Sequence, residues 1–145
     1  MMTIHFTVPG KPRGKQRPRV TRHGSFTPKE TKEYEEAVLT EFNTARWNDL
    51  NSAVYRTDKV TQAKVRITAC FPVPVSWSKV RKRQAYGMPY TGKPDADNIA
   101  KIILDGLNGA AYPDDAMVTC VSVTKRYCLE GEQPGVDVTL ALALE

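Results

Sequence analysis

The sequence predicts a single α/β (α+β) domain in which two main helices pack on one mixed β-sheet, in the order β-α-β-α-β-β. Three observations support this. Apolar residues alternate in several short segments, they recur at helical spacing in two longer ones, and no repeat or linker interrupts the 145 residues. A chain of this length can bury one sizeable core. We therefore expect one domain over residues 1–145.

The first half of the chain predicts strand, helix and strand. Residues 3–8 alternate, with Ile4, Phe6 and Val8 facing inward. A helix is expected to begin at Thr27, as N-cap of a capping box that ends at Glu30, and to run to about residue 47. Its predicted buried residues are Tyr34, Val38, Leu39, Phe42 and Trp47. Residues 48–61 are polar and predict a loop. Alternation at Val65, Ile67, Ala69 and Phe71 predicts the second strand.

The second half predicts a long loop, a helix and two strands. Residues 73–94 are basic and aromatic, and we expect a mobile loop whose aromatic side chains serve either as core or as base-stacking groups. The second helix is expected over residues 97–107, with Ile99, Ile102, Ile103 and Leu107 on its apolar face. Segments 119–123 and 136–144 alternate, which predicts two strands joined as a hairpin around residues 130–135.

Charge is distributed unevenly along this chain of formal net charge +5. The segment from Pro9 to Lys29 has seven basic residues and no acidic residue. The segment from Lys59 to Pro94 has eight basic residues and no acidic residue. Tracts of this kind are typical of segments that follow a phosphate backbone. The predicted DNA contacts are Lys11, Arg13, Lys15, Arg17, Arg19, Lys79, Arg81, Lys82 and Arg83.

Several function classes are disfavoured. Neither basic tract has the amphipathic apolar face used on membranes, no stretch reaches the ~18 apolar residues of a membrane span, and no signal-peptide pattern opens the chain. We therefore expect a cytoplasmic protein with no membrane partner. Three cysteines without CxxC spacing and two distant histidines argue against zinc or a histidine-based nucleophilic site, and the cysteines are expected to be reduced and mostly buried.

The most informative segment is acidic. Asp95 and Asp97 lie at the predicted start of the second helix, with Lys101 one turn along, and Asp114 and Asp115 follow the helix. With Asp97 as N-cap and Asp95 two residues earlier in extended chain, both carboxylates would face one ion. Oxygen ligands without Cys or His suit Mg²⁺ or Mn²⁺, which favours phosphodiester cleavage without a small-molecule cofactor.

Each of these residues also has a structural explanation. Asp97 alone would be a helix cap, Asp114 and Asp115 a turn, and Lys101 a surface residue paired with Asp97 or Asp105. Their joint occurrence beside two basic tracts is what favours a catalytic site.

The motifs D-A-D-N-I-A-K (95–101), D-G-L-N-G (105–109) and Y-P-D-D-A (112–116) resemble those of the RusA-type Holliday junction resolvases. The segments V-P-G-K-P-R-G-K-Q-R-P-R (8–19) and F-T-P-K (26–29) resemble the phage and prophage members. The resemblance implies a homodimeric endonuclease, dependent on Mg²⁺ or Mn²⁺, that resolves four-way DNA junctions by paired nicks in recombination and repair. The residues it implies as catalytic are Asp95, Asp97, Lys101 and Asp115, with Asp95, Asp97, Asp115 and, less firmly, Asp114 as metal ligands.

Two alternatives stay open at this point. The same residues would serve a nuclease that acts on flaps, replication forks, other branched DNA or RNA. A junction-binding protein that does not cleave is the second alternative, although carboxylates beside DNA give a pure binder no advantage.

Overall fold

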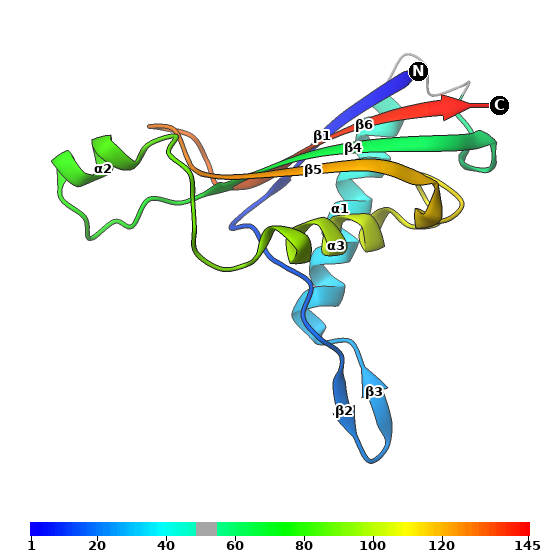
Figure 1. Ribbon diagram of the computed structural model, residues 1–145, viewed down its shortest axis with the longest axis horizontal. Coiled ribbons are helices and arrows are strands. Elements are labelled where there is room, and N and C mark those ends of the chain that lie inside the picture. Colours follow the sequence, from blue (N-terminus) through cyan, green and yellow to red (C-terminus); the bar gives the residue numbers. More distant parts are fainter. Residues whose placement is uncertain (49–54) are drawn as a thin grey trace.

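The fold has two layers, a four-stranded sheet and two helices that cover one of its faces (Figure 1). The structure is a computed structural model of the chain and describes residues 1–48 and 55–145. The sheet strands are β1 (Met2–Pro9), β4 (Val60–Phe71), β5 (Val118–Tyr127) and β6 (Gly135–Leu144). The helices on it are α1 (Lys29–Asn48) and α3 (Ala96–Leu107). The predicted fold class, a mixed sheet with two main helices, is confirmed.

The strand order β1-β6-β4-β5 shows that the predicted hairpin of the last two strands was wrong. β6 is antiparallel to both β1 and β4, whereas β5 pairs in parallel with β4 on the opposite side. The difference follows from composition. β6 buries Val136, Val138, Leu140 and Leu142 and so belongs in the middle of the sheet, while β5 is largely exposed and suits an edge.

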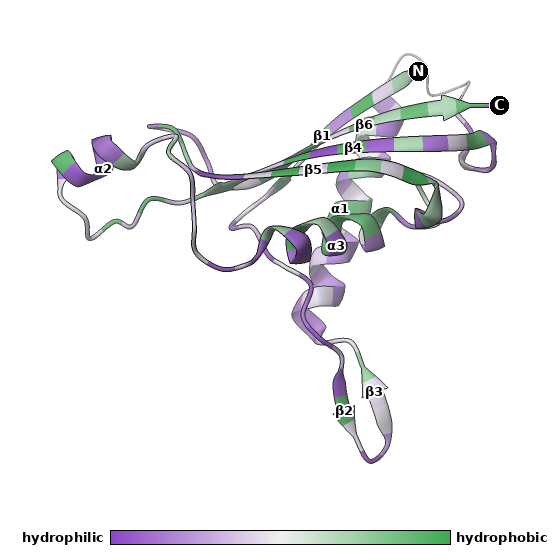
Figure 2. Cartoon of the chain, in the orientation of Figure 1, coloured by the Kyte–Doolittle hydropathy of each residue, from purple (hydrophilic) through white to green (hydrophobic). Residues whose placement is uncertain are grey.

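The core lies between the sheet and the two helices. The predicted inward residues of β1 and β4 and the four apolar residues of α3 are all buried. On α1, Tyr34, Val38 and Phe42 are buried and Leu39 is only partly buried. Trp47 is 79 % exposed in the last turn, so its predicted burial was wrong. Figure 2 shows apolar residues on α3 and along the strands, and polar residues over much of α1 and the outlying elements. The cysteines are free, with Cys70 and Cys128 buried and Cys120 exposed.

Five short elements were not predicted. They are the hairpin strands β2 (Arg19–Thr21) and β3 (Gly24–Phe26), helix α2 (Lys79–Ala85), and the 3-10 turns η1 (Thr57–Lys59) and η2 (Asp115–Met117). The hairpin projects from the body beyond the start of α1, and α2 lies at the end of the long axis opposite the termini (Figure 1). Helix α2 begins at Ser78, whose hydroxyl accepts a hydrogen bond from the backbone N–H of Arg81. The predicted loop at residues 48–61 falls partly on residues 49–54, which lie outside the described residues.

Candidate active site at helix α3

Helix α3 begins one residue earlier than predicted, and this changes the roles of its aspartates. Asp95 takes the N-cap position in extended conformation, so Asp97 lies in the first helical turn and is not the cap. Lys101 follows Asp97 by one turn on the same side of the helix. Both side chains are exposed, because the opposite side of α3 is fixed in the core by its buried isoleucines and Leu107.

The turn after α3 brings Asp115 back towards the helix. The chain reverses at Asn108 and Gly109, where a φ of +80° favours glycine. Tyr112 then donates from its hydroxyl to the backbone oxygen of Leu104 at 3.0 Å, and Asp115 donates its backbone N–H to the side-chain oxygen of Asn108 at 3.1 Å. These contacts hold Asp115 at the start of η2, beside the exposed side of α3.

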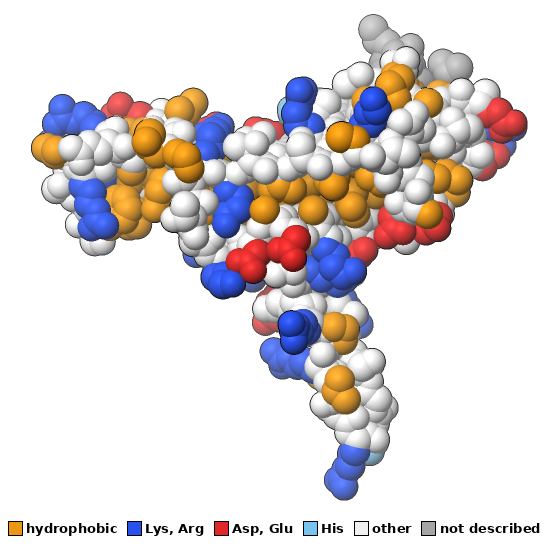
Figure 3. All heavy atoms as spheres, in the orientation of Figure 1, with side chains coloured by type: hydrophobic (Ala, Val, Ile, Leu, Met, Phe, Trp, Pro, Cys, Tyr) orange, Lys and Arg blue, Asp and Glu red, His pale blue; other side chains and the backbone are white. Residues whose placement is uncertain are grey.

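A cleft of about 480 Å³ between α3 and β5 brings together three of the four predicted catalytic residues, Asp97, Lys101 and Asp115. Its lining residues are Ala96, Asp97, Ala100, Lys101, Leu104, Asp105, Asp115, Val121 and Val123. Within this lining, Asp97, Lys101 and Asp115 form what we call the outer cluster. Among residues 1–48 and 55–145 none of the three forms an ion pair. In Figure 3 acidic and basic side chains are gathered where the body meets the projecting hairpin.

Asp95 does not line the cleft that Asp97, Lys101 and Asp115 share. It lines a second hollow, of about 360 Å³, together with residues of the N-terminal basic tract such as Lys11 and Arg13. Its carboxylate accepts a hydrogen bond from Lys93 at 2.9 Å. That bond and the ammonium charge of Lys93 lower the pKa of Asp95, while the same bond and the carboxylate charge of Asp95 raise the pKa of Lys93. Asp114 precedes η2 in extended conformation and does not line the cleft that Asp115 lines.

The donor atoms of the cleft fit a hard cation that is shared with a substrate. Among the described residues, no group of three or more His, Cys, Asp and Glu side chains is close enough to hold a metal ion by itself. Mg²⁺, however, is commonly held by one or two carboxylates together with water and substrate phosphate. Asp97 and Asp115 supply such a pair from two different elements.

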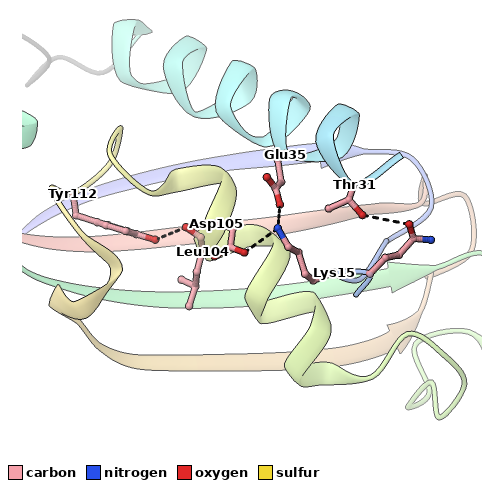
Figure 4. Close-up of polar contacts among 7 residues, drawn as sticks. Lys15, Thr31, Glu35, Leu104, Asp105 and Tyr112 are labelled. Atoms are coloured by element: carbon pink, nitrogen blue, oxygen red, sulfur yellow. Dashed lines mark hydrogen bonds and ion pairs between the residues drawn. The ribbon is translucent and has the colours of Figure 1, made fainter. Parts of the chain in front are cut away.

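A second charged cluster joins α3 to α1 through the N-terminal segment (Figure 4), and one of its members, Asp105, also lines the cleft. The ammonium of Lys15 contacts the carboxylates of Glu35 on α1 and of Asp105 on α3, the latter at 3.0 Å. We call Lys15, Glu35 and Asp105 the inner cluster. The pairing of Asp105 with Lys15 differs from the predicted structural role of Asp105 beside Lys101. Sequence spacing could not reveal this contact, because its members are 20 and 90 residues from Lys15.

The inner cluster is largely shielded from water. The Lys15 side chain is only 15 % exposed, against 22 % and 25 % for its two partners. Burial by itself would lower the pKa of Lys15, but the hydrogen bonds and charges of Glu35 and Asp105 outweigh it, so the pKa is raised. Of the residues predicted to contact DNA, Lys15 is therefore already neutralised within the protein.

The comparisons with known proteins show the family of the chain. Residues 9–141 match the family model described as Endodeoxyribonuclease RusA. The chain belongs to the RusA family. It is also similar to Uncharacterized protein YqaN of Bacillus subtilis (strain 168), with 32 % identity over 146 residues that cover 97 % of this chain and 96 % of that protein. RusA membership makes the chain a hydrolase of the endodeoxyribonuclease class, and the matched range contains both clusters on α3.

The other predicted DNA contacts of this RusA-family chain lie on its outlying elements. Lys11, Arg13, Arg17 and Arg19 are exposed along the segment that leads to the β2–β3 hairpin. On α2, Lys79, Arg81 and Arg83 are exposed and Lys82 is partly buried. In the part of the chain that is described, no helix is long and apolar enough to cross a membrane.

The aromatic side chains near α2 form a structural cluster. Tyr90 stacks on Phe71, with ring centroids 3.8 Å apart, and meets Tyr127 edge-on. Trp77 packs beside Tyr127. The guanidinium of Arg81 lies 3.7 Å from the centroid of the Trp77 ring. These contacts favour the core alternative for the aromatic residues of the 73–94 segment over base stacking.

Proposed function

We propose that this RusA-family protein resolves four-way DNA junctions by paired, metal-dependent nicks, as part of DNA recombination and repair. The supporting observation is the meeting of Asp97, Lys101 and Asp115 in one cleft, with no ion pair of their own among the described residues. Unpaired charges of both signs in an open cleft suit a ligand that carries both a cation and an anion, which is what a metal-bound phosphodiester presents.

In this mechanism Asp97 and Asp115 would hold Mg²⁺ or Mn²⁺ together with the substrate phosphate. When bound, the ion supplies a water of lowered pKa and neutralises charge that develops on the phosphate. Lys101 projects from the same side of α3 and adds a positive charge beside the non-bridging oxygens or the leaving group. Asp97 also lies in the first turn of α3, where the helix dipole favours negative charge.

Asp95 remains a predicted ligand whose carboxylate must first leave Lys93. The Lys93 side chain is 85 % exposed, so a DNA phosphate can take the place of Asp95 on its ammonium. Arrival of DNA would then release Asp95 towards the metal. Asp114, which does not line the cleft, is the less favoured of the two neighbouring aspartates.

We further propose that the active form is a cytoplasmic homodimer. A four-way junction has two-fold symmetry, so two identical sites related by a two-fold axis can cut two symmetric strands. Light scattering at several protein concentrations, with and without junction DNA, measures this directly. A mass of one subunit per junction under conditions that support cleavage would contradict the dimer.

The decisive experiment incubates the purified protein with end-labelled synthetic DNA and sizes the products on a denaturing gel. A fixed junction, a mobile junction, a flap and a linear duplex are compared in Mg²⁺ and in EDTA. We expect symmetric nicks in the junctions, in Mg²⁺ only. Preferential cutting of the flap would favour the branched-DNA alternative, and binding without cutting would favour the non-cleaving alternative.

The metal assignment has a test that does not depend on activity. Electron paramagnetic resonance of Mn²⁺ reports the fraction bound in the presence of a junction DNA analogue that cannot be cleaved. Asp97→Asn and Asp115→Asn are expected to weaken Mn²⁺ binding by at least about tenfold. The matched control is Glu35→Gln, which removes a carboxylate from the inner cluster and is expected to bind as wild type does. Equal Mn²⁺ affinity in all four proteins would remove the assignment.

A further inference from the structure

The β2–β3 hairpin is a projection that the body of the protein does not cover. All six of its strand residues, Arg19–Thr21 and Gly24–Phe26, are exposed. A two-stranded hairpin without a covering layer is marginally stable in water. Its turn is nevertheless well formed, because Gly24 has a φ of +113° and Thr21 bonds both the backbone oxygen of Gly24 and the N–H of His23. The turn therefore keeps the ribbon in shape, and its strand side chains stay open to a ligand.

The chemistry of the hairpin surface is basic and partly apolar. Arg19 and Arg22 lie in the strand and the turn, and no acidic residue lies anywhere between Pro9 and Lys29. Val20 is 82 % exposed and Phe26 47 % exposed. Protein arms that enter DNA grooves combine these features, with arginine for phosphate and groove edges and apolar side chains against sugars and bases.

The root of the hairpin is anchored on the catalytic helix. Lys15 donates its backbone N–H to the oxygen of Asn98 at 2.9 Å, and its ammonium joins the inner cluster. A Cβ at Gly14 would lie 2.7 Å from the Cβ of Pro94, so the segment packs as closely on the start of α3 as glycine allows. The hairpin therefore starts from a fixed position relative to Asp97.

We infer that the β2–β3 hairpin is a DNA-binding finger that contacts the substrate away from the cleaved phosphate. An extended chain rises ~3.3 Å per residue, so Arg22 can reach about 20 Å from Lys15. Phosphates along one strand are spaced by about 3.4 Å, so the tip would meet DNA about six nucleotides from the cut, or a second arm of the junction. The inference rests on the proposed DNA substrate and adds Val20, Arg22 and Phe26 to its contacts.

An acidic protein partner or a membrane fits the hairpin less well. Its basic tract is continuous with the hollow that Lys11, Arg13 and Asp95 line beside the active site, so a ligand that spans both regions must be an extended polyanion. A membrane surface would require an apolar face, whereas Val20 pairs with Ser25 and Phe26 pairs with Arg19. Because successive pairs of a ribbon face opposite sides, the two apolar side chains lie on opposite faces.

The test measures binding of a fluorescent four-way junction in EDTA by anisotropy, over a range of NaCl concentrations. The double variant Arg19→Gln/Arg22→Gln is expected to bind the junction about tenfold more weakly. It should also reduce the salt slope, the slope of the logarithm of the binding constant against the logarithm of the NaCl concentration, by about two in magnitude. Val20→Ser is expected to weaken binding by about threefold without a change in slope, because it removes an apolar contact and not a counterion-releasing one.

The matched control is Lys64→Gln/Arg66→Gln. These two exposed residues of β4 alternate with buried Val65 and Ile67, so they lie on the face of the sheet away from the helices. The control is expected to keep the wild-type slope. Identical slopes for the hairpin and control variants would overturn the finger. Failure of wild type to cut a junction that it binds, with the slope difference intact, would overturn the proposed nuclease step and leave the finger standing.

Discussion

The two charged clusters on α3 have similar composition and opposite environments. In the inner cluster one lysine is matched by two carboxylates and most of its surface is buried. In the outer cluster one lysine and two carboxylates are exposed and unpaired among the described residues. Paired, shielded charges fix structure and cannot take up a ligand, whereas unpaired charges in an open cleft are available to one. The comparison predicts that stability and catalysis can be separated on a single helix.

The largest effect is expected for Asp97→Asn. Loss of a metal ligand in the outer cluster should lower junction cleavage by about 10²–10³-fold or more, while the melting temperature and junction binding in EDTA stay near wild type. Single-turnover cleavage, calorimetry and anisotropy measure the three quantities. A fall in melting temperature equal to that of Glu35→Gln would show that the two clusters do not differ in the way proposed.

Lys101→Ala is expected to cause the second largest loss of junction cleavage, after Asp97→Asn. We expect cleavage to fall by about 10²-fold, with Mn²⁺ and junction binding retained, because the ammonium acts on charge that develops during reaction. Lys101→Arg should recover part of the rate. An unfolded Lys101→Ala protein would instead assign this lysine a structural role, as in the inner cluster.

Lys15→Met addresses the inner cluster. It leaves Glu35 and Asp105 facing each other without a cation, which should lower the free energy of unfolding by about 2 kcal/mol after allowance for partial exposure. For a domain of this size the melting temperature should fall by roughly 5–8 °C. Cleavage per folded molecule should change far less than in Lys101→Ala, and a loss of equal size would contradict the separation.

Gly14→Ala tests the close contact between the N-terminal segment and the start of α3. The added Cβ would meet the Cβ of Pro94 at 2.7 Å and that of Asn98 at 3.1 Å, so the start of α3 must shift. We expect a stability loss of about 1–2 kcal/mol together with weaker Mn²⁺ binding. Stability loss alone would show that the start of α3 can move without disturbing Asp97.

The smallest effect is a pH dependence of stability. The hydrogen bonds and charges of Glu35 and Asp105 raise the pKa of Lys15 above its ordinary value of 10.5. The stability that the charged Lys15 adds is therefore fully present below pH 10.5 and is lost as the pH rises through the folded-state pKa. The difference in unfolding free energy between wild type and Lys15→Met should therefore shrink as the pH rises above the ordinary lysine value of 10.5. Urea denaturation across this range measures it, and a constant difference would exclude the charge of Lys15 as the cause.

The sequence predicted what depends on local periodicity. The strands around Phe6 and Ile67 and the buried face of α3 follow from apolar spacing, and their positions were right. The order of β5 and β6 in the sheet was wrong, because a turn-rich connection such as residues 130–135 does not say whether a third strand lies between its ends. For the site, the helix start was placed one residue late, since both Asp95 and Asp97 are good caps. The inner cluster depends on tertiary packing and has no local signal.

The central place of β6 has a consequence for synthesis of the protein. β6 pairs with β1 on one side, where Met2 lies opposite Leu142, and with β4 on the other. Both ladders therefore need residues 135–144. A nascent chain that has reached only residue 134 carries β1 and β4 with open hydrogen-bonding edges and an uncovered apolar face, and such intermediates are prone to aggregate. The cleft beside β5 therefore lies on an edge of a sheet that is complete only once residues 135–144 have been synthesised, and loss of this segment is expected to be as damaging as loss of the core.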